Sequence, residues 1–146
     1  MTFDNLSDKP DGSDTLLFRT FNSQEERREF GGSDFIEFQY CKLDKRSKIN
    51  KIVSIDAIGK WKDDSLYLFG DDIDEFFSHY GKIFNGGIYN NEKCGIVDFY
   101  GINYYTLEQS NLIIERVNKE NPLDYQILLN WLDDVKKYNG FYILGV

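Results

Sequence analysis

The spacing of apolar residues changes partway along this chain of 146 residues. Between Phe35 and Leu43, apolar side chains alternate with polar ones, as they do in a half-buried strand. Between Asp72 and Phe84, apolar residues recur at the three- and four-residue intervals of a helix with one buried face. Both periods occur without a linker long enough to divide the chain. The pattern therefore predicts one α+β domain: a mostly antiparallel sheet packed against two to four helices.

Alternating and apolar segments predict the strands. An apolar run that reaches the last residue predicts that the C-terminus belongs to the sheet, and the basic segment Lys42–Lys51 is expected to be a turn. The run near Gly101 is expected to be one central strand or two short ones kinked at that glycine. The expected strands are Leu16–Phe21, Phe35–Leu43, Ile96–Tyr105 and Phe141–Val146, with a hairpin formed by Val53–Trp61 and Leu66–Phe69.

Capping patterns and helical spacing predict four helices. Ser23 with Glu26, and Thr106 with Gln109, have the spacing of capping boxes. Pro122 is suited to the first position of the last helix, and Gly140 to the position just past its end. The expected helices are Gln24–Phe30, a segment from Asp72 that ends before Asn85, a segment from Thr106 that includes Val117, and a segment from Pro122 to Tyr138.

The first 13 residues are polar, with Pro10 among them, and are expected to form a flexible leader before a domain spanning residues 14–146. No run of about 18 apolar residues and no signal-like stretch occurs, so we expect a cytoplasmic protein that does not insert into a membrane.

The chain has 25 acidic and 17 basic residues, a net charge of −8. Negative charge repels nucleic acid and anionic membranes, so the partner we expect is a basic protein. The expected strand Leu66–Phe69 separates two acidic clusters by roughly 17 Å at about 3.3 Å per residue, which exceeds a Debye length of about 8 Å. Solubility and helix dipoles also account for such acids. The candidate partner-binding residues are Asp63, Asp64, Asp71, Asp72, Asp74 and Glu75, with Tyr67 and Tyr89 as candidate aromatic anchors.

Residues typical of catalysis are scarce. His79 is the one histidine and follows Glu75 by four residues, which favours a solvated pair on a helix surface. Cys41 and Cys94 have no metal-ligand spacing with His79, and reduced buried thiols are favoured over one disulfide. We therefore expect no catalytic residue, no metal and no cofactor.

Asp98 is the exception, because it lies between Val97 and Phe99 in a run suited to a buried strand. A buried carboxylate must be paired, protonated or placed at an edge. A structural aspartate is favoured, and the alternative is a small enzyme or ligand-binding domain with a pocket around Asp98.

Three segments, Phe84–Tyr89, Val97–Gly101 and Gly140–Gly145, together with the acidic and aromatic-rich composition, resemble the immunity proteins of bacterial contact-dependent inhibition and other polymorphic toxin systems. The resemblance implies an inhibitor that binds a toxin domain, often a nuclease, and covers its active site or a surface needed for substrate. It assigns no functional residue. A third interpretation, an acidic mimic of DNA, requires a more continuous array of carboxylates than a chain with the basic segment Lys42–Lys51 provides.

Overall fold

The computed structural model describes residues 17–31, 35–54, 58, 62–89, 92–93, 97 and 101–145. The strands in these ranges are β1 (Phe18–Arg19), β2 (Phe35–Tyr40), β3 (Leu66–Phe69), β4 (Ile88–Tyr89), β5 (Glu92–Lys93), β6 (Ile102–Tyr105) and β7 (Phe141–Leu144). The α-helices are α1 (Gln24–Gly31), α2 (Ile49–Ile52), α4 (Ile73–Tyr80), α5 (Leu107–Glu120) and α6 (Tyr125–Asp133). Short 3₁₀ helices, η2 (Gly70–Asp72) and η3 (Asp134–Lys137), precede α4 and extend α6.

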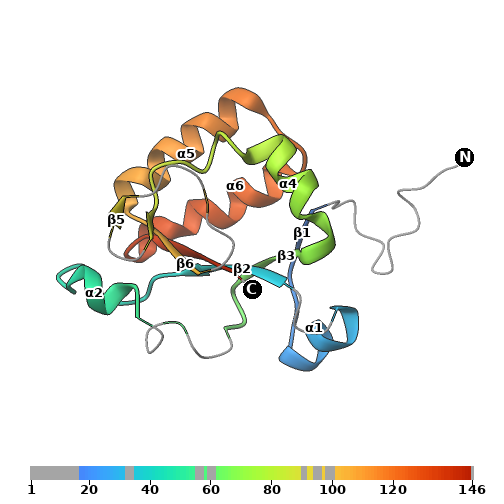
Figure 1. Ribbon diagram of the computed structural model, residues 1–146, viewed down its shortest axis with the longest axis horizontal. Coiled ribbons are helices and arrows are strands. Elements are labelled where there is room, and N and C mark those ends of the chain that lie inside the picture. Colours follow the sequence, from blue (N-terminus) through green and yellow to red (C-terminus); the bar gives the residue numbers. More distant parts are fainter. Residues whose placement is uncertain are drawn as a thin grey trace, which may run out of the picture.

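These strands form one sheet in the order β1-β3-β2-β7-β6-β4-β5, and every pairing is antiparallel. Helices α4, α5 and α6 cover one face, and α1 and α2 lie on the opposite side (Figure 1). The predicted α+β class is therefore confirmed. The predicted leader, residues 1–13, lies outside the described residues. Among the described residues, no helix has the length and apolar character required to cross a membrane.

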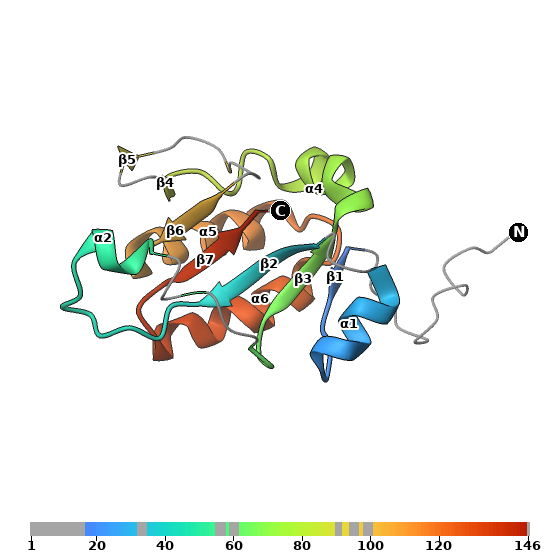
Figure 2. The same cartoon turned by 60° about the horizontal axis from the view of Figure 1, so that its bottom comes forward.

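The C-terminal strand β7 lies in the middle of the sheet, between β2 and β6 (Figure 2). Phe141, Tyr142 and Ile143 are all buried because both edges and both faces of the strand are covered. This confirms the prediction that the C-terminal segment belongs to the sheet. The absence of polar alternation in this segment reflects a strand that is buried on both sides.

The alternation in β2 separates the two faces as predicted. Ile36, Phe38 and Tyr40 belong to the main core beneath α4, α5 and α6. The ring of Phe38 makes edge contacts with Phe76 of α4 and Trp131 of α6. The aromatic residues of the chain therefore hold the helical layer against the sheet.

The opposite face of β2 carries two smaller apolar clusters, with polar residues between them. Phe35 packs in a cluster near α1, and Cys41 packs in another that includes Ile52 of α2. Between them, Gln39 donates to the Glu37 carboxylate at 3.0 Å. Although Gln39 is polar, only 1% of its surface is exposed, so this face is not a simple solvent face.

The predicted hairpin between Val53–Trp61 and Leu66–Phe69 is wrong. Strand β3 pairs with β1 on one edge and with β2 on the other, which leaves no edge at Tyr67 and Leu68 for a second hairpin partner. Val53 caps α2, which itself begins inside the segment expected to be a turn. The long-range pairing of β3 with β2 forms in place of the local hairpin because it aligns the apolar residues of the two strands. Residues 55–57 and 59–61 lie outside the described residues.

The predicted start of the last helix at Pro122 is also wrong, because α6 begins at Tyr125. Asp124 precedes it in a left-handed conformation with φ of 61°. Its carboxylate accepts hydrogen bonds from the backbone N–H groups of Leu17 and Phe18. Asp124 therefore satisfies donors beside β1, an edge strand, and this long-range contact could not be read from local helix signals.

The other helix predictions agree with the structure. The Ser23 hydroxyl accepts from the Glu26 N–H (3.1 Å) at the start of α1, and the Thr106 hydroxyl accepts from the Gln109 N–H (3.1 Å) at the start of α5. Helix α4 ends at Tyr80, ahead of Asn85. Strand β6 covers Ile102–Tyr105 of the predicted strand Ile96–Tyr105, of which residues 96 and 98–100 lie outside the described residues.

Candidate partner-binding site

The six predicted acidic residues lie at opposite ends of β3. Asp63 and Asp64 form the turn that enters the strand, and the other four follow it in η2 and the first turn of α4. We refer to the first region, with the groove described below, as the groove end. The second region, Asp71 to Glu75, is the α4 end.

At the α4 end the carboxylates face solvent. Asp71, Asp74 and Glu75 are exposed, and Asp72 is half-buried. Glu75 lies 3.4 Å from His79 Nε2 one helical turn later, as the spacing predicted. Among the described residues, no lysine or arginine forms an ion pair with Asp71, Asp74 or Glu75. The dipole of α4 favours acids at this position.

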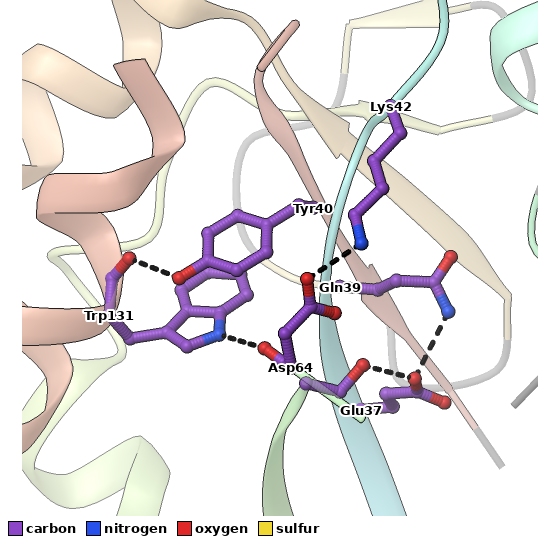
Figure 3. Close-up of polar contacts among 7 residues, drawn as sticks. Glu37, Gln39, Tyr40, Lys42, Asp64 and Trp131 are labelled. Atoms are coloured by element: carbon purple, nitrogen blue, oxygen red, sulfur yellow. Dashed lines mark hydrogen bonds and ion pairs between the residues drawn. The ribbon is translucent and has the colours of Figure 1, made fainter. Parts of the chain in front are cut away.

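At the groove end, Asp64 connects three parts of the chain (Figure 3). Its Oδ2 atom lies 2.6 Å from Lys42 Nζ, just beyond β2. Its backbone carbonyl accepts a 2.9 Å hydrogen bond from the indole N–H of Trp131 in α6. The other carboxylate oxygen, Oδ1, is buried and has no hydrogen-bond partner among the described residues. This carboxylate is thus held in place by its backbone and satisfied at only one oxygen.

Aromatic rings form a wall beside Asp64. The rings of Tyr40 and Trp131 are stacked at a centroid distance of 4.1 Å, and Tyr138 lies 4.9 Å from Tyr40. The Tyr40 hydroxyl donates to the Trp131 carbonyl at 2.7 Å. Lys42 Nζ lies 5.4 Å from the centre of the Tyr138 ring, within the range of a cation–π contact.

A groove of about 420 Å³ runs between α6–η3 and the adjacent ends of β2 and β3. Asp64 enters it from the β3 side and Asp134 from the α6 side, so two carboxylates 70 positions apart in the sequence share one groove. Its lining residues are Thr20, Tyr40, Asp64, Leu66, Ile127, Asn130, Trp131, Asp134, Lys137 and Tyr138.

Asp133 and Asp134 add negative charge that the sequence analysis did not assign to this region. Asp133 lies 3.2 Å from Lys136 Nζ, and Asp134 lies 3.1 Å from Lys137 Nζ. Burial, followed by the negative charges of Asp134 and Asp64, raises the pKa of the Tyr40 phenol above its usual range. The hydrogen bond that Lys42 donates to the Asp64 carboxylate raises the pKa of Lys42. In the sequence, Asp133-Asp134 followed three residues later by Lys136-Lys137 indicates a charged pair of helical turns. Only the fold brings these residues opposite Asp64.

On the other face of the sheet, Glu37 forms a small polar network close to the groove end (Figure 3). The Ser65 hydroxyl donates to Glu37 Oε2 at 2.6 Å, and Gln39 donates to the same oxygen. Because Gln39 and Ser65 are both buried, this network joins β2 to the turn before β3 away from solvent. It fixes the backbone next to Asp64.

One of the two aromatic anchors predicted from sequence is buried. Tyr67 is only 2% exposed and packs against Phe21 and Phe35, so it is wrong as an anchor. Tyr89 is half-buried, and Tyr80 is buried as predicted. Tyr138, at the end of the predicted last helix, is half-buried: it packs against the main core and also lines the groove.

The remaining candidate residues have simpler surroundings. His79 lies on the exposed surface of α4. Cys41 is a buried free thiol that accepts a hydrogen bond from the Tyr142 hydroxyl at 3.4 Å, which agrees with a structural role. Cys94 and Asp98 lie outside the described residues, so the alternative pocket around Asp98 stays a hypothesis. Within the described ranges, no three His, Cys, Asp or Glu side chains are grouped to hold a metal ion.

Comparisons with known proteins do not place the chain in a family: no family model, no curated protein and no solved structure matches it.

Proposed function

We propose that this chain is an immunity protein that binds a cognate bacterial toxin domain, a basic nuclease, and neutralises it. The two proteins form a tight heterodimer in the cytoplasm, and the complex blocks the active site of the toxin or the surface that receives its substrate. The chain acts by binding, without a catalytic residue or cofactor of its own. The whole-chain resemblance and the net charge of −8 support this function.

The observation that carries the proposal is the exposure of the carboxylates at the α4 end. Asp71, Asp74 and Glu75 are presented on a folded helix and the turn before it, and no lysine or arginine among the described residues neutralises them. Their field therefore extends into solvent, where it attracts a basic partner from about one Debye length, roughly 8 Å at physiological salt. A nuclease needs positive charge to bind phosphates, and an inhibitor that meets this charge competes with the substrate.

The two ends of β3 have complementary tasks in this mechanism. Exposed charges at the α4 end accelerate encounter, because steering depends on charges that remain unscreened by an intramolecular partner. Aromatic and carboxylate groups at the groove end provide close contacts, which chiefly determine how slowly a complex dissociates.

Co-expression tests the proposal directly. The chain is co-expressed with the product of the gene immediately upstream of its own, and we expect copurification as a one-to-one complex together with relief of that protein's toxicity. A toxin domain from an unrelated system serves as the control and is expected neither to copurify nor to be neutralised. An upstream product that is not toxic, or a toxic one that this chain neither binds nor neutralises, contradicts the proposal.

A second experiment tests the mechanism of neutralisation. Purified toxin is assayed on nucleic acid with increasing amounts of this chain, and we expect activity to fall to zero at one equivalent. Full nuclease activity in the assembled complex would show that the chain does not block the active site or the substrate surface.

A further inference from the structure

We infer that the groove end is a recognition site for one arginine side chain of the basic partner, and that Lys42 occupies the cation position of this site in the unbound protein. The inference rests on the proposed function for the identity of the partner as a basic protein. It adds the residue type that is recognised and the intramolecular group that must leave.

The unbound groove already holds a cation in the geometry expected for such a site. Lys42 Nζ is 2.6 Å from Asp64 Oδ2 and 5.4 Å from the centre of the Tyr138 ring. A carboxylate on one side and an aromatic face on the other are the two groups with which proteins bind cationic side chains. The position therefore attracts a cation, and the chain's own lysine fills it in the absence of a partner.

Lys42 satisfies only part of this site. An ammonium group contacts a single oxygen here, and Asp64 Oδ1 stays buried without a hydrogen-bond partner among the described residues. A guanidinium is planar and donates two parallel hydrogen bonds to one carboxylate, so it can satisfy both oxygens of Asp64 at once. It also stacks on aromatic faces such as that of Tyr138. Arginine is therefore a better occupant than the lysine that it replaces.

The surroundings permit the exchange. The Lys42 side chain is 41% exposed, so its ammonium group can turn into solvent when another cation takes its place. Asp64 is held by its backbone, since the Trp131 indole N–H donates to its carbonyl. Asp134 lines the opposite side of the groove and places a second carboxylate near the incoming cation. Lys42 leaves while the acidic and aromatic groups remain in position.

The experiment uses three small probes: the amides of N-acetylarginine, N-acetyllysine and N-acetylcitrulline. Binding is followed by NMR through the indole N–H signal of Trp131, which reports on the Asp64 carbonyl. We expect the arginine probe to shift this signal in the millimolar range, the lysine probe to act more weakly, and the neutral citrulline probe to have no effect. Citrulline has nearly the shape of arginine, so it separates charge from size.

Two variants are expected to act in opposite directions. Lys42→Met removes the internal occupant and is expected to tighten arginine binding about three- to tenfold, and Asp64→Asn is expected to abolish it. Lys82→Met and Glu115→Gln make the same changes in net charge at exposed residues outside the groove lining, so they are matched controls for general electrostatics. The inference is overturned if the control variants change arginine binding as much as Lys42→Met and Asp64→Asn do. It is also overturned if arginine does not shift the Trp131 signal in either the wild type or Lys42→Met.

Failure of the arginine site and failure of the proposed immunity function give different results. If the chain neutralises its toxin and Asp64→Asn leaves both affinity and the arginine response unchanged, the immunity function stands and the arginine site is wrong. If arginine binds as expected and no toxin partner exists, the site stands and the immunity function is wrong.

Discussion

The two acidic regions at the ends of β3 have similar sequences and different surroundings. At the groove end, Asp64, Asp133 and Asp134 each lie within 3.2 Å of a lysine, and Asp64 also joins an aromatic wall. At the α4 end, Asp71 and Asp74 have no such neighbour among the described residues. Carboxylates therefore produce a field that is largely cancelled locally at one end and extends into solvent at the other. The number of acids in a segment says little about the role of its charge.

Replacement of Trp131 should separate the two ends most strongly. Trp131 is 8% exposed and holds the Asp64 carbonyl, so Trp131→Ala is expected to lower the free energy of unfolding by about 3–5 kcal/mol. Asp74→Asn at the α4 end should change it by less than about 0.5 kcal/mol, because its side chain is exposed. Urea unfolding of both variants measures the difference, and similar losses would show that the α4 end is also part of the structural framework.

Alkaline pH should distinguish the ends through Tyr40. Burial raises the pKa of the phenols of Tyr40, Tyr67, Tyr80, Tyr104 and Tyr142. The stabilisation from keeping them protonated is therefore complete below about pH 10, the unfolded value, and is lost as the pH rises toward their folded pKa values. Well above pH 10, each tyrosine should lower the free energy of unfolding by about 1.4 kcal/mol per pH unit.

Tyr40→Phe should make this alkaline slope shallower, by at most about 1.4 kcal/mol per pH unit, and Asp74→Asn should leave it unchanged. Urea unfolding between about pH 9 and about pH 11 measures the slopes, because this range spans the pKa of tyrosine in the unfolded chain, about 10. An unchanged slope in Tyr40→Phe would mean that this phenol ionises equally well in the folded protein.

Association kinetics with the proposed toxin should separate steering from close contact. The triple variant Asp71→Asn, Asp74→Asn, Glu75→Gln is expected to bind about tenfold more slowly at low salt, with its dissociation rate unchanged. Asp64→Asn is expected to dissociate faster while its association rate changes little. Stopped-flow measurements over a range of salt concentrations test both statements, and the reverse assignment of the two rates would exchange the roles of the two ends.

The smallest effect is expected for the Lys42–Asp64 pair itself. Both side chains are partly exposed, 41% and 31%, so a double-mutant cycle with Lys42→Met and Asp64→Asn should give a coupling of less than about 1 kcal/mol. Because Asp64 raises the pKa of Lys42, this coupling is complete below about pH 10.4 and is lost as the pH rises through the folded pKa of the lysine. A much larger coupling would mean that Lys42 is a structural residue and not an exchangeable occupant of the groove.

Local signals predicted what depends on neighbouring residues. The capping boxes at Ser23 and Thr106 begin helices as expected, and the alternation in Phe35–Tyr40 separates two faces of a strand. The strand partners of Leu66–Phe69 were predicted wrongly, because register is decided by apolar residues more than 25 positions away in the chain. For the same reason, Tyr67 was mistaken for an exposed anchor although it is buried against Phe21 and Phe35.

The sequence by itself determined the class of the fold, the presence of the C-terminal strand in the sheet and the division of the acidic residues into two clusters, since each follows from hydrophobic period or from distance along one strand. Only the tertiary structure decided what these clusters are next to. Asp64, Lys42 and Trp131 lie far apart in the chain, and pairing of β2 with β3 under α6 brings them into one site. Charge and aromatic content are properties of residues, whereas a groove that joins them depends on long-range packing that local patterns do not encode.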